Sequence, residues 1–178
     1  LLLKLMKILQ INNYNYLKGG SEKVYQVTIE LLKANGHQVK YFSIADPRNE
    51  ELCEGYAVSI QKWSDVKGLG GKLKGVRNFI YNRQVAWQLD SFLQEYHPDV
   101  AHLHIFYGNL SNAIVDVLRK HHIPMVQSVH EFRLLCPVYT CLDPHLEICE
   151  KCAKETLKLS CVLKRCVKLS LIHISEPT

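Results

Sequence analysis

Two short strand-like segments, joined by a glycine-containing turn and a helical segment, constrain the fold of this chain most. Residues 6–12 form an apolar run that Asn12-Asn13 ends as a turn signal. After Gly19-Gly20, apolar residues recur at helical spacing as far as Gly36, and residues 37–44 then alternate as a second strand. Strand, turn, helix and strand in this order predict a βαβ unit, whose crossover is right-handed.

The helix between these strands carries start and stop signals. We expect Ser21 to be its N-cap, Glu22 to favour its positive end and Gly36 to close it. The residues at helical spacing, expected to face the core, are Val24, Val27, Thr28, Leu31 and Leu32. The expected core side of the second strand is Val39, Tyr41 and Ile44.

The rest of the chain continues the alternation. Residues 45–75 read as a long irregular connection. The pattern then predicts a helix over 76–96, a strand over 100–106, a helix over 110–122 and a buried strand over 124–129. The sequence therefore predicts an α/β fold with a doubly wound parallel sheet, in one domain over 6–168.

Composition limits the classes of partner. Of the 178 residues, 47% are hydrophobic and 22% charged, as in ordinary globular chains. The net charge of +5 comes from lysines and arginines that are scattered along the chain. They do not form the dense basic stripe of a nucleic-acid-binding protein, but binding of anionic substrates or lipid head groups stays an alternative. No apolar run approaches the roughly 20 residues of a membrane span, and residues 1–6 are too short for a signal peptide. We expect a cytoplasmic protein that starts at Met6 and keeps its cysteines reduced.

The Gly19-Gly20 pair lies between a predicted strand and a predicted helix start. Without Cβ atoms the backbone can approach a ligand closely, and free amides at a helix start bind anionic oxygen. A diphosphate or a sugar hydroxyl would suit such a site. The alternative is a tight turn that needs positive φ.

Histidines mark the carboxyl ends of two predicted strands. His130-Glu131 follows the strand over 124–129, where ligands of open parallel sheets bind. An imidazole there can donate to a sugar hydroxyl or to a developing charge, and a structural histidine is the alternative. His102 and His104 share one face of the preceding strand; we expect His102 in the core, whereas His104 is a candidate for the cleft. Arg133 is expected either to bind an anionic group of a ligand or to form a surface salt bridge with a carboxylate of the chain.

Seven cysteines include a Cys-x-x-Cys pair, Cys149 and Cys152, flanked by Cys136 and Cys166. These four thiolates could hold a structural zinc ion in a segment of little apolar content. Cys141 and Cys161 are spare candidates, and reduced cysteines packed as small apolar groups are the alternative.

Several motifs, in order, resemble the N-terminal domain of glycosyltransferase family 4, from Met6 to about Lys168. They are Gly19-Gly20-Ser21-Glu22, Pro98-Asp99-Val100-Ala101-His102-Leu103-His104, His130-Glu131 with Leu135-Cys136-Pro137, and the cysteine-rich segment 136–166 ending in Arg165-Cys166. Glu131 stands where the family more often has Asp. The resemblance implies a Rossmann-like half of a GT-B fold.

By this resemblance, the full enzyme is of the hexosyltransferase type and moves a sugar from a nucleotide-sugar to a glycan or lipid-linked acceptor. Configuration is retained, and catalysis needs no metal. His130 and Glu131 would support transfer, while Gly19, Gly20, Ser21, His104 and Arg133 would bind substrate. Polysaccharide biosynthesis at the inner membrane face is the implied setting, and a basic loop is expected to contact acceptor or membrane: Lys62, Trp63, Lys67, Lys72 and Lys74.

The resemblance also implies a C-terminal domain that holds most of the nucleotide. Residues 169–178 resemble translated sequencing-adapter read-through, so we expect a truncated product that is inactive alone. The alternative function is a non-enzymatic, zinc-stabilised module that binds a glycan or an anion. A nucleotide-dependent epimerase or dehydrogenase is disfavoured, because no Gly-x-Gly-x-x-Gly fingerprint is present and no acidic residue ends the second strand.

Overall fold

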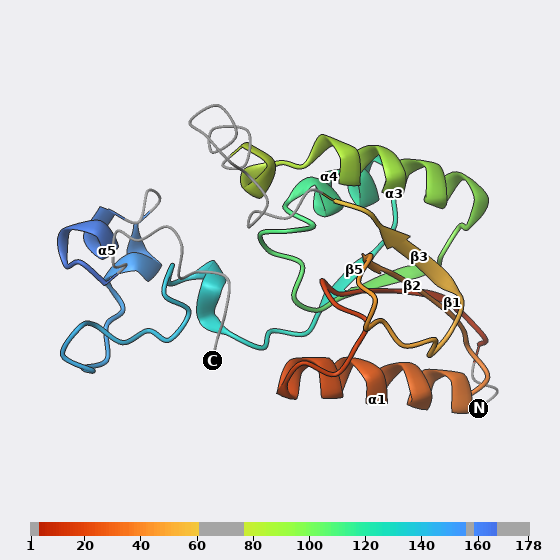
Figure 1. The fold of residues 1–178 in the computed structure, drawn as a ribbon, viewed down its shortest axis with the longest axis horizontal. Coiled ribbons are helices and arrows are strands. Elements are labelled where there is room, and N and C mark those ends of the chain that lie inside the picture. Colours follow the sequence, from red (N-terminus) through yellow and green to blue (C-terminus); the bar gives the residue numbers. More distant parts are fainter. Residues whose placement is uncertain (1–3, 61–76, 156–158, 167–178) are drawn as a thin grey trace. The chain divides into compact units, whose positions relative to one another are not determined.

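The computed structural model describes residues 4–60, 77–155 and 159–166. The chain forms two compact units, one up to Ser128 and one from Val129 onward. In the first unit, five strands pair in parallel in the order β3-β2-β1-β4-β5 (Figure 1). The strands are β1 (Lys7–Ile11), β2 (Gln38–Ile44), β3 (Gly55–Val58), β4 (Val100–Leu103) and β5 (Met125–Gln127). This order confirms the predicted doubly wound, Rossmann-like α/β class.

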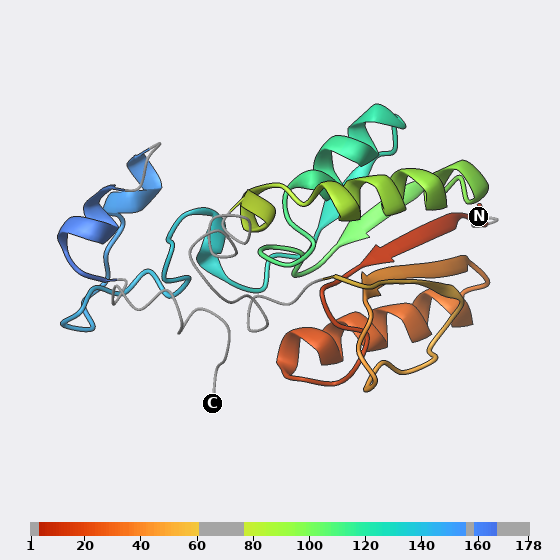
Figure 2. The same ribbon diagram turned by 45° about the horizontal axis from the view of Figure 1, so that its top comes forward.

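Helices cover both faces of this sheet. Figures 1 and 2 show α1 (Gly20–Ala34) on one face, and α3 (Arg83–Glu95) with α4 (Ala113–Lys120) on the other. The larger core lies between the sheet and α3 and α4, where Leu9, Leu89 and Leu118 have no exposed surface. Each such side chain contributes about 1.5–3 kcal/mol by leaving water. The smaller core, under α1, is formed by Tyr25, Ile29 and Val39.

Asp90 links the two helices of the larger core. Its Oδ1 accepts hydrogen bonds from Lys120 Nζ at 2.8 Å and His121 Nε2 at 2.7 Å. The hydrogen bonds from Lys120 and then His121 lower the pKa of Asp90 below its usual value. The contact fixes α3 against the end of α4.

Two strand predictions were wrong. The last strand, β5, has only three residues and lies at the sheet edge, with Val126 57% exposed, where a longer buried strand was expected. Residues 45–75 were expected to be irregular, but β3 (Gly55–Val58) lies within them and pairs with β2 in parallel. A four-residue edge strand is too short to show a clear period in the sequence.

The orientation of α1 also differs from the prediction. Gly19, not Ser21, is the N-cap, and Ser21 lies in the first turn. The buried face of α1 carries Tyr25 and Ile29, whereas Val24 is 49% and Leu31 58% exposed. Two of the four buried residues of α1, Glu22 and Gln26, are polar. The buried face therefore does not stand out as an apolar stripe in the sequence.

The second unit has little regular structure. It contains the 3-10 helices η2 (Phe132–Leu134) and η3 (Lys151–Lys154), the short helix α5 (Leu159–Leu163) and an isolated antiparallel bridge between Leu142 and Ile148. Among the helices of the described ranges, none is long and apolar enough to cross a membrane. The basic loop residues expected to contact acceptor or membrane, and the 169–178 tail, lie outside the described residues.

Candidate functional site

The carboxyl ends of β1 and β4 form the topological switch point of the sheet. From β1 the chain crosses to β2 on one side, and β4 pairs with β1 on the other side. Loops that leave neighbouring strands in opposite directions leave a crevice between them, which is where open α/β sheets bind ligands. The two loops concerned are residues 12–19 and 104–112.

Asn12 and Asn13 join these two loops. The Asn12 Oδ1 accepts from the backbone N–H of Ile105 at 3.0 Å. Asn13 Oδ1 accepts from the N–H of Leu110 at 3.3 Å, while its Nδ2 donates to the carbonyl oxygen of Tyr107 at 3.0 Å. Both asparagines are buried, so their side chains serve the loop backbone and hold the two loops together.

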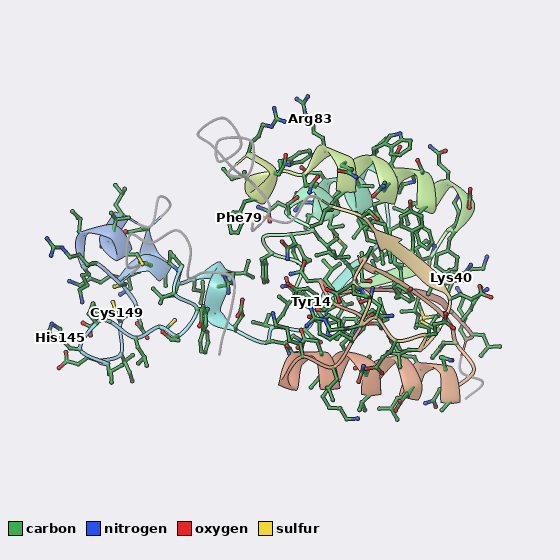
Figure 3. All side chains as sticks on the ribbon, viewed as in Figure 1. Tyr14, Lys40, Phe79, Arg83, His145 and Cys149 are labelled. Atoms are coloured by element: carbon green, nitrogen blue, oxygen red, sulfur yellow. The ribbon has the colours of Figure 1, made fainter. Side chains whose placement is uncertain are left out.

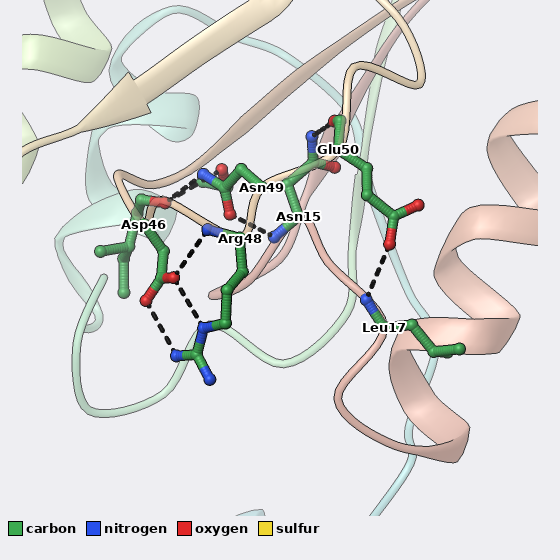
Figure 4. Close-up of polar contacts among 8 residues, drawn as sticks. Asn15, Leu17, Asp46, Arg48, Asn49 and Glu50 are labelled. Atoms are coloured by element: carbon green, nitrogen blue, oxygen red, sulfur yellow. Dashed lines mark hydrogen bonds and ion pairs between the residues drawn. The ribbon is translucent and has the colours of Figure 1, made fainter.

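Asn15 joins the same first loop to the loop after β2, as Figure 4 shows. Its Nδ2 donates to the carbonyl of Glu50 at 2.6 Å, and its N–H donates to Asn49 Oδ1 at 3.2 Å. The Glu50 carboxylate accepts in turn from the N–H of Leu17 at 3.3 Å. The segment that leads into the Gly19-Gly20 turn is therefore held from both sides, and the turn is presented on a rigid support.

The Gly19-Gly20 turn starts α1 at the carboxyl edge of the sheet, which is called the rim below. Gly19 has extended backbone with φ −166°, and Gly20 is the first helical residue, so neither needs the positive φ that favours glycine. A Cβ on Gly20 would meet no atom of the described chain within 4 Å, and one on Gly19 would lie 3.6 Å from Glu22 Oε2. The alternative of a tight turn that needs positive φ is therefore wrong, and the space beside Gly20 is open.

The helix start beside this turn already holds a carboxylate. Glu22 is 6% exposed, and Ser21 Oγ donates to its Oε2 at 2.9 Å. A carboxylate in the first turn stabilises the positive end of a helix. It also repels a second anion, so the free amides of this turn suit a hydroxyl-bearing ligand better than a phosphate.

The two strand histidines are part of one polar network, in which His104 is buried and His102, which was expected in the core, is half-buried. His104 is 1% exposed, and its Nε2 lies 3.0 Å from Gln10 Oε1. His102 Nδ1 lies 3.2 Å from Gln10 Nε2, and its Nε2 lies 2.8 Å from Ser128 Oγ. Tyr25 packs edge-on against His104, with ring centroids 5.2 Å apart. His104 is thus placed beneath the rim rather than on its open surface, while a role in substrate binding stays a prediction.

His130 lies two residues after Ser128, which ends the first unit. Ser128 is fixed by His102 and by its N–H, which donates to the carbonyl of Leu103 at 2.9 Å. His130 itself belongs to the second unit, so the convergence of Gly20 and His130 on one rim stays a prediction. Within that unit Glu131 pairs with Arg133, whose guanidinium also lies 5.1 Å from the Tyr139 ring centroid.

An open cavity of about 370 Å³ lies beside the loop after β2. Its walls include three carboxylate side chains, Asp46, Glu50 and Glu51, together with Tyr41. The size suits a small molecule. Glu50 is also held by Leu17, as described above, and Asp46 by Arg48 at 2.8 Å, so much of this polar lining is already paired.

Within the described ranges, no group of three or more His, Cys, Asp or Glu side chains is arranged to hold a metal ion. The seven cysteines all lie in these ranges and are present as thiols. The zinc site predicted at Cys136, Cys149, Cys152 and Cys166 therefore stays a prediction.

The sequence interpretation missed the three asparagines that fix the rim: Asn12, Asn13 and Asn15. It used Asn12-Asn13 only as a turn signal. An asparagine run directly after a strand that ends at a switch point is the signal that could have found them, because buried loop backbone needs side-chain partners.

Fold and rim together define a Rossmann-like α/β domain, a class of domain that binds its ligands at the carboxyl edge of the sheet. The model of Glycosyltransferase Family 4 matches residues 18–159, well over half of the chain. The chain belongs to this family and is of the glycosyltransferase type, with a fold consistent with one half of a GT-B enzyme. No curated protein matched the chain.

Proposed function

We propose that this chain is the N-terminal, acceptor-side domain of a retaining glycosyltransferase of the hexosyltransferase type. The enzyme transfers a sugar from a nucleotide-sugar to a glycan or lipid-linked acceptor, without a catalytic metal. The family match over 18–159 supports the class. The donor is held mainly by a second, C-terminal domain, and the N-terminal domain is inactive without it.

One observation carries the proposal. Gly19 and Gly20 stand where the fold itself accepts a side chain, because neither has positive φ and the space beside Gly20 is open. At the first helical position, Gly20, glycine lowers stability relative to alanine by up to about 1 kcal/mol, whereas at the N-cap, Gly19, glycine is favoured over alanine. A glycine at position 20, where packing does not require one, is explained if a ligand approaches the backbone amides there.

The remaining residues have the following roles in the proposal. His130 contacts the donor sugar and stabilises charge that develops as the glycosidic bond forms, and Glu131 orients the loop that carries it. Ser21 and the turn amides bind a sugar hydroxyl. Arg133, which pairs with Glu131, positions that carboxylate.

The setting of the reaction is also part of the proposal. The enzyme works in the cytoplasm at the inner face of the membrane, in the biosynthesis of polysaccharide or lipid-linked glycans. The net charge of +5 supports attraction to anionic lipid head groups.

A nuclear magnetic resonance titration of the ¹⁵N-labelled chain tests the rim. The probes are methyl α-glucoside, UDP-glucose and inorganic pyrophosphate. We expect the glucoside and UDP-glucose to shift the amides of Gly20, Ser21 and Glu22 at millimolar concentration, and pyrophosphate alone to shift them less. Gly20→Val is expected to weaken the effect about 3–10-fold, which corresponds to one lost hydrogen bond of 0.5–1.5 kcal/mol.

The control is Ala34→Val, which introduces the same valine side chain at the exposed far end of α1. It is expected to leave the shifts unchanged. If no probe shifts these three amides, or if both variants weaken binding equally, the rim is not a sugar site. Micromolar affinity for UDP-glucose in calorimetry would contradict the assignment of donor binding to another domain.

A further inference from the structure

Gln10 lies between the two strand histidines and decides which of their ring nitrogens carry protons. Its side chain is fully buried in β1, in register with His102 of β4. His104 Nε2 lies 3.0 Å from the amide oxygen of Gln10, and His102 Nδ1 lies 3.2 Å from the amide nitrogen. An amide oxygen only accepts hydrogen bonds, and an amide nitrogen only donates them. His104 therefore carries a proton on Nε2, whereas Nδ1 of His102 carries none.

The same argument extends from His102 to Ser128. An imidazole whose Nδ1 accepts a hydrogen bond is neutral and carries its proton on Nε2. His102 Nε2 lies 2.8 Å from Ser128 Oγ, so its N–H donates to that hydroxyl oxygen. The buried amide of Gln10 thus fixes the tautomer of His102, and this tautomer provides the donor that holds Ser128.

This network lies next to the loops of the candidate site. The N–H of His104 donates to the carbonyl of Ile11, the last residue of β1, at 2.9 Å. Asn12 follows directly, and its Nδ2 donates to the carbonyl of Tyr14 at 2.8 Å. Tyr14, labelled in Figure 3, belongs to the loop over residues 12–19. The histidines are therefore connected to the first loop of the rim.

Ser128 ends the first unit at a part of the sheet that has little apolar packing. β5 has only three residues and lies at the sheet edge, where Val126 is 57% exposed. Hydrogen bonds hold this end instead. The N–H of Ser128 donates to the carbonyl of Leu103 at 2.9 Å, and its Oγ accepts from His102. The chain continues from this point to His130, two residues later.

Packing alone does not explain a histidine at position 102. His102 is half-buried and lies in register with Val126 of β5. Strands favour β-branched or aromatic side chains at such places, and those need no hydrogen-bond partner. His102 instead uses both ring nitrogens, one toward a buried amide and one toward a serine hydroxyl. Such an arrangement fixes the orientation of the group that it holds.

We propose that His102 is a positioning residue of the transferase. As the Nε2–H tautomer that Gln10 selects, it holds Ser128 Oγ and thereby fixes the point from which the segment with His130 starts. This inference rests on the proposed function, in which His130 contacts the donor sugar. A group that acts on a reacting sugar has to be held within about 0.5 Å of its productive position, so an anchor close in the chain bears on the reaction.

Nuclear magnetic resonance of the ¹⁵N-labelled full chain tests the tautomer. Two-bond correlations between the ring protons and ring nitrogens distinguish a protonated nitrogen from a bare one. We expect His102 to show a protonated Nε2 and a bare Nδ1 at neutral pH, and His104 to show a protonated Nε2.

Two matched pairs of variants separate anchoring from packing. His102→Gln keeps an N–H donor near the position of Nε2, whereas His102→Asn is too short to reach Ser128. Ser128→Thr keeps the hydroxyl, and Ser128→Ala removes it. We expect His102→Asn and Ser128→Ala to speed hydrogen exchange of the Ser128 amide about 3–10-fold, as one lost hydrogen bond does, and to lower the ¹H–¹⁵N nuclear Overhauser effects of Val129 and His130. His102→Gln and Ser128→Thr are expected to leave both unchanged. Urea unfolding shows that the first unit is folded in each variant.

The proposal is overturned if His102 carries its proton on Nδ1, or on both nitrogens at neutral pH. It is also overturned if His102→Gln loosens the Ser128 amide as much as His102→Asn does, or if Ser128→Ala changes nothing. The glucoside titration of the rim amides distinguishes this failure from that of the proposed function. Shifted rim amides without the anchor refute the positioning role alone, whereas an intact anchor with unshifted rim amides refutes the transferase role and, with it, the positioning role.

Discussion

Replacing Asn13 by alanine is expected to loosen the contact between the two loops of the candidate site. Asn13 is 5% exposed, and its side chain holds the loop after β4 through Leu110 N–H and the Tyr107 carbonyl. Leu110 is fully buried, so its N–H would lose its partner away from water. An orphaned buried N–H costs about 1–3 kcal/mol, and the second lost hydrogen bond about 0.5–1.5 kcal/mol. The free energy of unfolding of the first unit should therefore fall by about 2–4 kcal/mol.

Urea unfolding followed by far-ultraviolet circular dichroism measures this change, and amide hydrogen exchange locates it. The Leu110 amide should exchange faster in Asn13→Ala than expected from the global change. Asn112→Ala is the matched control, because Asn112 is exposed and its side chain makes no cap hydrogen bond to α4. It should cost less than about 0.5 kcal/mol. Equal losses in both variants would refute the argument that Asn13 fixes the loop.

Two further predictions concern the fold that carries the site. Ile29→Ala should lower the free energy of unfolding by about 2–5 kcal/mol, because Ile29 is buried. Leu31→Ala should lower it by less than about 0.5 kcal/mol, because Leu31 is 58% exposed. Thermal or urea unfolding measures both changes, and the reverse order would mean that α1 packs on its other face. Burial, foremost, raises the pKa of Tyr96 to about 12, above the value near 10 of an unfolded tyrosine. The neutral phenol therefore adds stability that is complete below pH 10 and is lost as pH rises toward 12, so Tyr96→Phe should flatten this alkaline decline; an unchanged slope would show that Tyr96 does not titrate there.

Local pattern was sufficient where an element is long or has a clear turn signal. Residues 110–122 were predicted as a helix with four core residues, and all four are buried in the structure: Leu110, Ile114, Val117 and Leu118. The pattern failed for α1 because Glu22 and Gln26 share the buried stripe with Tyr25 and Ile29. Their burial depends on neighbours from other parts of the chain, which no window of sequence contains.

Some residues of the candidate site could be found in the sequence, and others only in the structure. The Gly19-Gly20 turn and the His130-Glu131 pair could be found in the sequence, because their chemistry lies in adjacent residues. The role of Asn13 could not, since its partners lie 94 and 97 residues away. The cysteine positions were plain in the sequence, but only the structure shows that Cys136, Cys152 and Cys161 are the buried ones.

The sequence alone determined the alternation of strands and helices, and with it the parallel, doubly wound class and the family. These follow from short-range periodicity and from the right-handed crossover, which any chain of this pattern obeys. Only the tertiary structure decided which face of α1 is buried, that β5 is an exposed edge and that His104 lies beneath the rim. A side chain's surroundings are set by elements that meet only after the sheet has formed, and a parallel sheet covered on both faces leaves no alternation from which to read them.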